Sequence, residues 1–172
     1  MANNTNITSS NQNNIESIID SNNAFGFKLN KALQRATPSD NILISPYSIS
    51  SVFNLLYDGA SGKTAEEIKT VFEITSNNTH RMHTLKNQHQ QLNQFESSNT
   101  LLISNAIWVE KTSQIKPTFI SIGKTTYNTA IESCNFIENA NNERIKINQF
   151  IENKTNHRIK DILPDGSVNK NT

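Results

Sequence analysis

The chain lacks the features that define several large classes of protein. Its 172 residues include one cysteine, Cys134, which excludes an intrachain disulfide and a cysteine-based zinc cluster and favours a reducing compartment. No stretch approaches the roughly 20 apolar residues of a membrane span. The first residues carry neither a charged start nor an apolar run, so we expect no secretory signal. A cytoplasmic protein is therefore expected, with unconventional export to the extracellular space as the alternative.

An excess of either charge is also missing. Lys and Arg total 16 against 15 for Asp and Glu, which gives a net charge of +1. This balance argues against a nucleic-acid or membrane-surface partner. The mean hydropathy is −0.57 although only 18% of the residues are charged, because uncharged polar residues, asparagine above all, are abundant. A chain of this length has material for one ordinary domain.

The N-terminal part of the sequence predicts a polar arm followed by a long helix. Residues 1–14 are polar and aperiodic, which predicts a disordered arm, so the folded part is expected to span residues 15–172. Apolar residues then recur at near-helical spacing from Ile15 to Leu33, and this pattern predicts a helix that Thr37-Pro38 ends.

Three further segments follow in the first half of the chain. Ile42 to Ile44 is interpreted as a short buried strand. Ser45 can cap a helix that Pro46 opens and Asp58-Gly59 ends. Thr64 and Glu67 form a capping-box pattern for another helix. A looser helix, rich in histidine and glutamine, is expected around Met82, Leu85, Leu92 and Phe95.

The second half predicts a sheet with helices. Leu101 to Val109 is apolar on both alternating faces, as in a central strand covered on both sides. Pro117 can open a short helix, Thr129 to Phe136 is interpreted as a strand, and a last helix is expected around Ile147 to Ile151. Pro164-Asp165-Gly166 predicts a turn. The fold class is therefore mixed α/β (α+β).

Four segments, in this order, resemble the serpins, the serine protease inhibitor superfamily. They are NILISPYSIS (Asn41–Ser50), DGASGKTAEEI (Asp58–Ile68), SNAIWVEK (Ser104–Lys111) and INQFIENKTNHRIKDILP (Ile147–Pro164). The resemblance covers about residues 15–172 and implies helices A to F with strands of the central sheet. Phe150 stands where the family commonly has Trp. His157 stands where Gly is usual, which strains a left-handed position.

The resemblance implies a protease inhibitor with a metastable fold and not an enzyme, with no catalytic residue and no cofactor. In the family, a reactive-centre loop is cleaved by a serine protease, or in some members a cysteine protease, and inserts between strands 3A and 5A. This chain ends where strand 3A should begin, so we expect it to be an incomplete domain that does not inhibit a protease by itself. Ser45 and Ser48 match shutter positions, whose hydroxyls join a hydrogen-bond network under the sheet.

Two other functions remain open. The strand Leu101 to Val109 has no charge to protect an unpaired edge, which favours oligomerisation or a partner strand. The main alternative is therefore a truncated, non-inhibitory serpin-like protein that acts by protein–protein interaction or strand donation. A free-standing helical binding module is the third hypothesis.

Individual residues suggest few other sites. His80, Arg81, His83 and Lys86 lie on the predicted histidine-rich helix; a solvated polar face is the default interpretation and a weak polyanion surface the alternative. His80 and His83 lack a third ligand, so no metal site is expected. Cys134 lies in an apolar strand pattern and is interpreted as core, not as a nucleophile. Trp108 is likewise interpreted as core.

Overall fold

The computed structural model describes residues 5–74, 78–93, 101 and 103–172, with the side chains of residues 5–17 and 93 excepted. The chain forms two compact units, residues 1–89 and 90–172. No helix in the described ranges combines the length and the apolar character needed to cross a bilayer.

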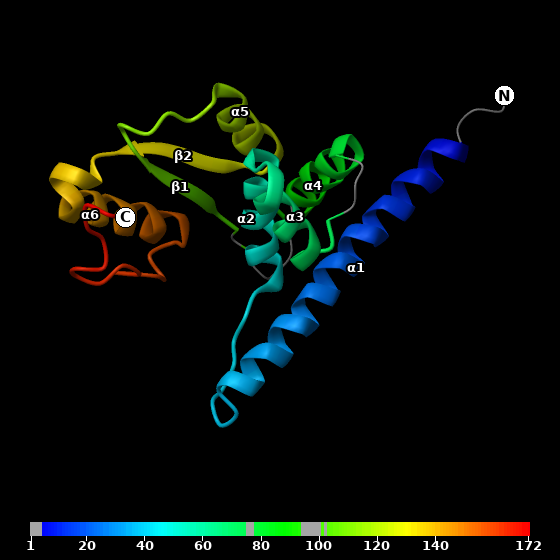
Figure 1. Ribbon diagram of the computed structural model, residues 1–172, viewed down its shortest axis with the longest axis horizontal. Helices are drawn as coiled ribbons and strands as arrows, with labels where there is room; N and C mark the ends of the chain where they lie inside the picture. The colour runs from blue at the N-terminus through cyan, green and yellow to red at the C-terminus, as the bar shows by residue number, and fades with distance from the viewer. Residues whose placement is uncertain (1–4, 75–77, 94–100, 102) are drawn as a thin grey trace. The chain divides into compact units, whose positions relative to one another are not determined.

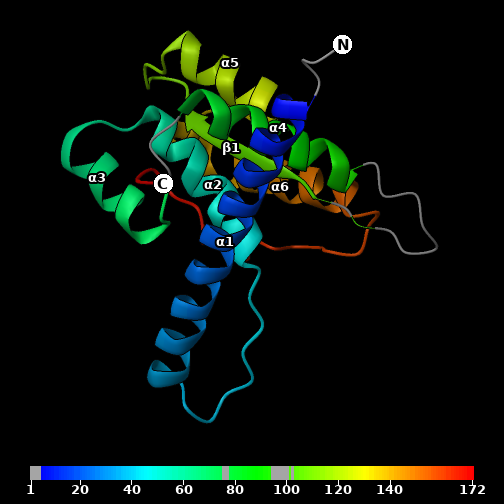
Figure 2. The ribbon, with the colours of Figure 1, turned by 90° about the vertical axis from the view of Figure 1, so that its right-hand side faces the viewer.

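The first unit is helical. It contains α1 (Thr5–Ala36), α2 (Pro46–Gly59), α3 (Gly62–Val71) and most of α4 (Asn78–Asn93) (Figures 1 and 2). Its core is built on Phe25, Phe72 and Ile74. Partly buried apolar residues of α1, α2 and α3 pack against this core: Leu29, Ile49, Phe53, Tyr57 and Ile68. Phe72 stacks on Phe53 with ring centroids 4.6 Å apart.

Helix α1 ends where the sequence predicts and begins earlier. It stops at Ala36, before Thr37-Pro38. Its backbone is helical from Thr5, which differs from the disordered arm expected over residues 1–14; residues 1–4 of that arm lie outside the described residues. Once a helix is nucleated, each added residue gains a hydrogen bond, so a helix that starts on an apolar stripe can extend into polar sequence.

Helix α2 confirms the predicted capping. Ser45 is the N-cap, its hydroxyl accepts a hydrogen bond from Ser48 N, Pro46 opens the helix and Gly59 ends it. A Cβ built on Gly26 of α1 would lie 2.9 Å from Cγ of Pro46. Glycine at position 26 therefore allows α1 to approach the start of α2 closely.

Two local predictions in this unit were wrong. Residues 42–44 are not a strand, because no described segment pairs with them, and Leu43 is 99% exposed. Thr64 and Glu67 do not form the capping box, because α3 begins earlier, at Gly62, with Ser61 at the N-cap. Gly62 has a φ of 56°, a conformation that glycine adopts without strain, and this permits the earlier start.

The second unit contains a β–α–β unit followed by a long helix. Strand β1 (Asn105–Glu110) is joined through α5 (Pro117–Thr126) to the parallel strand β2 (Thr129–Cys134), and α6 (Phe136–Lys154) follows (Figure 1). The register pairs Asn105 with Thr129 and Glu110 with Cys134. Strand β1 is thus shorter than the predicted Leu101–Val109, and Leu102 lies outside the described residues.

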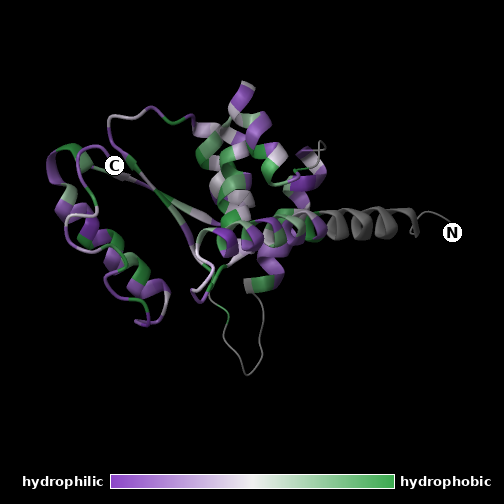
Figure 3. Cartoon of the chain, turned by 60° about the horizontal axis from the view of Figure 1, so that its bottom comes forward, coloured by the Kyte–Doolittle hydropathy of each residue, from purple (hydrophilic) through white to green (hydrophobic). Residues whose placement is uncertain are grey.

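Helix α6 and the segment after it cover one face of this sheet. The core comprises Cys134, Phe136, Ile147 and Val168, with Trp108 packed against it. Trp108 also meets Phe150 edge-to-face at 5.3 Å, so Phe150 supplies an aromatic contact on the sheet. Hydrophobic and hydrophilic residues alternate along α6 (Figure 3), as expected of a helix with one buried face.

The C-terminal segment is tied to α6 by polar contacts. The buried side chain of Asn148 donates to Leu163 O and accepts from Leu163 N, both at 2.9 Å. His157 N donates to Glu152 O at 2.8 Å, and Asn156 and His157 have φ values of 50° and 60°. The left-handed conformation predicted at His157 is confirmed. The predicted turn is also present, closed by Ser167 N and Pro164 O at 3.1 Å.

Candidate functional site

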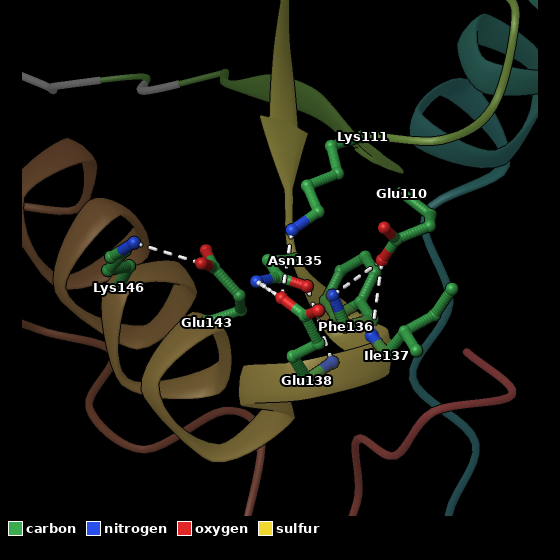
Figure 4. Close-up of polar contacts among 8 residues, drawn as sticks. All are labelled: Glu110, Lys111, Asn135, Phe136, Ile137, Glu138, Glu143 and Lys146. Atoms are coloured by element: carbon green, nitrogen blue, oxygen red, sulfur yellow. Dashed lines mark hydrogen bonds and ion pairs between the residues drawn. The ribbon is translucent and has the colours of Figure 1, made fainter.

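A polar clasp joins the C-terminal ends of the two strands to the start of α6 (Figure 4). Oε2 of Glu110, the last residue of β1, accepts hydrogen bonds from Phe136 N at 2.6 Å and Ile137 N at 3.2 Å. A carboxylate at a helix N-terminus satisfies N–H groups that lack helical partners and interacts favourably with the helix dipole. Glu110 therefore holds the first turn of α6 at the end of β1.

A second set of contacts reinforces this clasp. Asn135 is the N-cap, and its Oδ1 accepts from Glu138 N at 3.3 Å while its Nδ2 donates to Glu138 Oε2 at 2.8 Å. Lys111 Nζ lies 2.9 Å from the same oxygen. The hydrogen bond from Asn135 and the interactions with Lys111 lower the pKa of Glu138. The carboxylate thus stays charged where the helix dipole favours it.

The helix bends immediately after this clasped turn. Asn139 has φ −143° and ψ 36°, which are not helical values. The first turn, Phe136 to Glu138, is thereby separated from the longer part of α6 that covers the sheet. The clasp fixes the first turn, and Asn139 provides a change of direction between the two parts.

Cys134, the last residue of β2, carries a buried thiol. Burial, and to a smaller extent a hydrogen bond with Glu143, raises the pKa of Cys134 to about 11. Glu143 is buried and pairs with Lys146 Nζ at 2.9 Å, as Figure 4 shows, and this contact lowers its pKa. Cys134 is 4% exposed and packs in the core, as predicted, and its thiol is protonated at neutral pH.

The predicted shutter residues lie together at the start of α2. The hydroxyl oxygens of Ser45 and Ser48 are 2.8 Å apart, and Ser45 also caps the helix. Both residues are exposed on the first unit. The pair thus forms a small polar group that is organised by capping.

Arg81 does not belong to the polyanion surface predicted on α4, because its side chain is buried. His80, His83 and Lys86 are exposed, but Arg81 is only 3% exposed. Its guanidinium pairs with Asp58, donates to Asn54 Oδ1 at 2.9 Å and lies 5.1 Å from the ring centroid of Tyr57. The assignment of Arg81 to the surface was therefore wrong, because a buried partner on α2 draws the side chain inward.

Two polar features, the burial of His89 and the contact of Glu110 with α6, were not predicted from the sequence. His89 is 3% exposed, and its Nδ1 lies 2.8 Å from the hydroxyl of Tyr47, while burial lowers its pKa. Arg81 and His89 each lie one helical turn from the buried Leu85, so helical spacing could have placed both on the buried face. Glu110 offered a weaker signal, a carboxylate directly after an apolar strand.

Comparisons with known proteins agree with this architecture. The family described as Serpin (serine protease inhibitor) matches residues 20–172. An uncharacterized serpin-like protein of Methanosarcina acetivorans is 33% identical over 153 residues, covering 88% of this chain and 36% of its own length. The human leukocyte elastase inhibitor is 29% identical over 92% of this chain and 41% of its own length.

Solved structures show the same fold. The structure of a tumour suppressing serpin superposes with a TM-score of 0.83 at 28% identity, over 92% of this chain and 43% of that chain. The family match and the shared fold thus define a member of a protease-inhibitor family with a mixed helix-and-sheet domain. The chain belongs to the serpin family, which confirms the predicted family and fold class. It spans 36–41% of the length of the two relatives above.

Proposed function

We propose that this chain supplies the helical frame and the β1–β2 part of the central sheet of a serpin that inhibits a serine-type endopeptidase by loop insertion. The single observation that supports this function most strongly is the serpin match over residues 20–172. A relative named leukocyte elastase inhibitor points to the same activity. In this proposal the protein is not an enzyme, and its reactive-centre loop lies outside the 172 residues.

The test is an assay for a covalent protease complex. The longest product of the same reading frame is incubated with a panel of serine proteases, and SDS-resistant adducts are sought by electrophoresis. We expect an adduct with at least one protease and none with the 172-residue chain alone. A longer product that all proteases degrade without an adduct would contradict inhibition. Cysteine proteases form the second arm of the panel.

The alternative is interaction by strand donation without inhibition. It is favoured by the unpaired outer edges of β1 and β2, since these two strands are the whole sheet in the described part of the chain. Size-exclusion chromatography with light scattering tests it directly. Oligomers of the chain, or a stable complex with a longer serpin, would support this function, and a strictly monomeric chain that ignores the longer protein would contradict it.

The earlier site assignments remain proposals within this function. Ser45 and Ser48 serve as the polar group under the sheet of the complete protein. His80, His83 and Lys86 form a weak polyanion surface on the exposed side of α4. Heparin-affinity elution tests this surface, and equal elution of wild type and Lys86→Gln would contradict it. Fractionation of the source cells tests cytoplasmic residence against export.

A further inference from the structure

The end of the sheet opposite the clasp contains a cavity. It has a volume of about 400 Å³ and lies where β1 and β2 begin, with walls from the end of α5 and the last turn of α6. This volume falls in the range of roughly 300–1,000 Å³ that is typical of small-molecule sites. The cavity belongs wholly to the second unit.

One part of the cavity lining is apolar. Leu101 and Ile103 precede β1, and Phe150 belongs to α6. Phe150 is held in place by its edge-to-face contact with Trp108 in the core. This part of the lining can therefore receive an apolar group without rearrangement of the sheet.

The other part of the lining is positively charged. Among the described residues that line the cavity, the ionisable ones are two lysines, Lys124 of α5 and Lys154 of α6. Lys154 Nζ lies 5.6 Å from the ring centroid of Phe150, so a charged group sits directly beside the apolar part. Neither lysine forms an ion pair with a described carboxylate.

The charges and the shape together select a class of ligand. Two cations in a recess lined by no described carboxylate favour an anion, and Asn128, an exposed residue of the lining, adds a neutral polar side chain. The adjacent apolar lining favours a ligand that carries a ring or a short hydrocarbon. We propose that this cavity binds a small organic anion whose acidic group lies between Lys124 and Lys154 and whose apolar part lies against Leu101, Ile103 and Phe150.

The test separates the charge from the apolar part. The ¹⁵N-labelled chain is titrated with phenyl phosphate, with inorganic phosphate and with phenol at constant ionic strength. We expect saturable shifts for phenyl phosphate confined to amides around residues 101–105, 124–130 and 150–154. Inorganic phosphate lacks the ring and phenol lacks the acidic group, so each should bind at least about tenfold more weakly than phenyl phosphate.

Matched variants locate the site. Lys124→Gln and Lys154→Gln should each lower the affinity for phenyl phosphate by about tenfold, and the double variant should show no saturable binding. Lys63→Gln, at an exposed lysine of α3 in the other unit, should have no effect. Both cavity lysines are exposed, so the variants are expected to fold, which the dispersion of their spectra verifies. Unchanged binding in the double variant, binding of inorganic phosphate as strong as that of phenyl phosphate, or the absence of saturable shifts would overturn the proposal.

Discussion

A single residue, Gly26, determines how closely two helices of this chain approach each other. Gly26 is buried on α1, and a methyl group there would meet the ring of Pro46. A proline ring at the first position of a helix has little freedom to move, since its φ is fixed and its ring is closed. The separation of α1 and α2 therefore depends on the absence of a side chain at position 26.

Gly26→Ala should destabilise the first unit. Alanine improves helix propensity by about 1 kcal/mol, but overpacking against Pro46 costs about 1–3 kcal/mol, so a net loss in the free energy of unfolding is expected. Urea denaturation measures it. Asn23→Ala, at an exposed position of the same helix, is the control and should be neutral or slightly stabilising. A Gly26→Ala variant as stable as wild type would show that α1 can shift away from Pro46.

His157→Gly should have the opposite effect. The φ of 60° at His157 costs a residue with a Cβ about 1–2 kcal/mol that glycine avoids. The lost hydrogen bond between His157 and Glu152 lies at the surface and contributes little. We expect a gain of about 0.5–1 kcal/mol in thermal or urea unfolding, after the entropic cost of glycine. Arg158→Gly, next along the chain and at a negative φ, should instead be neutral or destabilising.

At the scale of elements, the attachment of α6 to the sheet is asymmetric. Its first turn is held by Glu110, Lys111 and Asn135, whereas the part after Asn139 is held mainly by apolar contacts and by the bonds of Asn148. The strength of these polar contacts depends on charge and on direction, whereas apolar contacts are not directional. The two parts of α6 should therefore respond differently to the same substitution.

Glu110→Gln should loosen the first turn alone. The amide keeps one acceptor but loses the charge that interacts with the helix N-terminus, at a cost of about 1–2 kcal/mol. Hydrogen exchange should speed up at the amides of Phe136 and Ile137 and stay unchanged at Ile147 and Ile151. Glu132→Gln, at an exposed carboxylate of the neighbouring strand, should leave all four amides unchanged. Uniform acceleration along α6 would show that the helix behaves as one body.

For the whole chain, the burial of His89 predicts a dependence of stability on pH. Burial lowers the pKa of His89 in the folded state. As the pH falls below about 6.5, the unfolded state therefore binds a proton at His89 while the histidine of the folded state stays neutral. The stabilisation is therefore complete above about pH 6.5 and decreases as the pH falls, by at most about 1.4 kcal/mol per pH unit for one proton.

Denaturation at about pH 7.5 and about pH 5.5 tests this dependence. His89→Gln should remove the part of the pH difference that His89 causes, whereas His83→Gln, at an exposed position of the same helix, should retain it. Glu138, Glu143 and Glu152, whose pKa values are lowered, stay charged over this interval and do not contribute to it. An identical pH difference in wild type and His89→Gln would exclude the histidine as its source.

Much of the fold could be predicted because its signals are local. Ser45-Pro46 and Asp58-Gly59 mark both ends of α2, and Thr37-Pro38 marks the end of α1, since capping groups and proline act within a few residues. Capping failed at Thr64, where Gly62 gave the chain an earlier start. Local patterns also failed at residues 42–44, because a strand requires a partner that no local pattern can supply.

The sites were less predictable because they depend on contacts between distant segments. Arg81 meets Asp58, and Glu110 meets Phe136, across separations that spacing on one element does not reveal. The cavity at the start of β1 and β2 combines residues from four segments and left no sequence pattern. Cys134 and Trp108 were assigned to the core correctly because an apolar strand pattern is itself a local signal.

The parallel pairing of β1 and β2 also has a consequence for biosynthesis. Parallel partners need a crossover, here α5, so β1 leaves the ribosome well before the strand that pairs with it. During that interval β1 has two unpaired edges and an apolar sequence. A nascent-chain chaperone should therefore contact this unit most strongly between the emergence of β1 and that of β2, and release it when α6 covers the sheet.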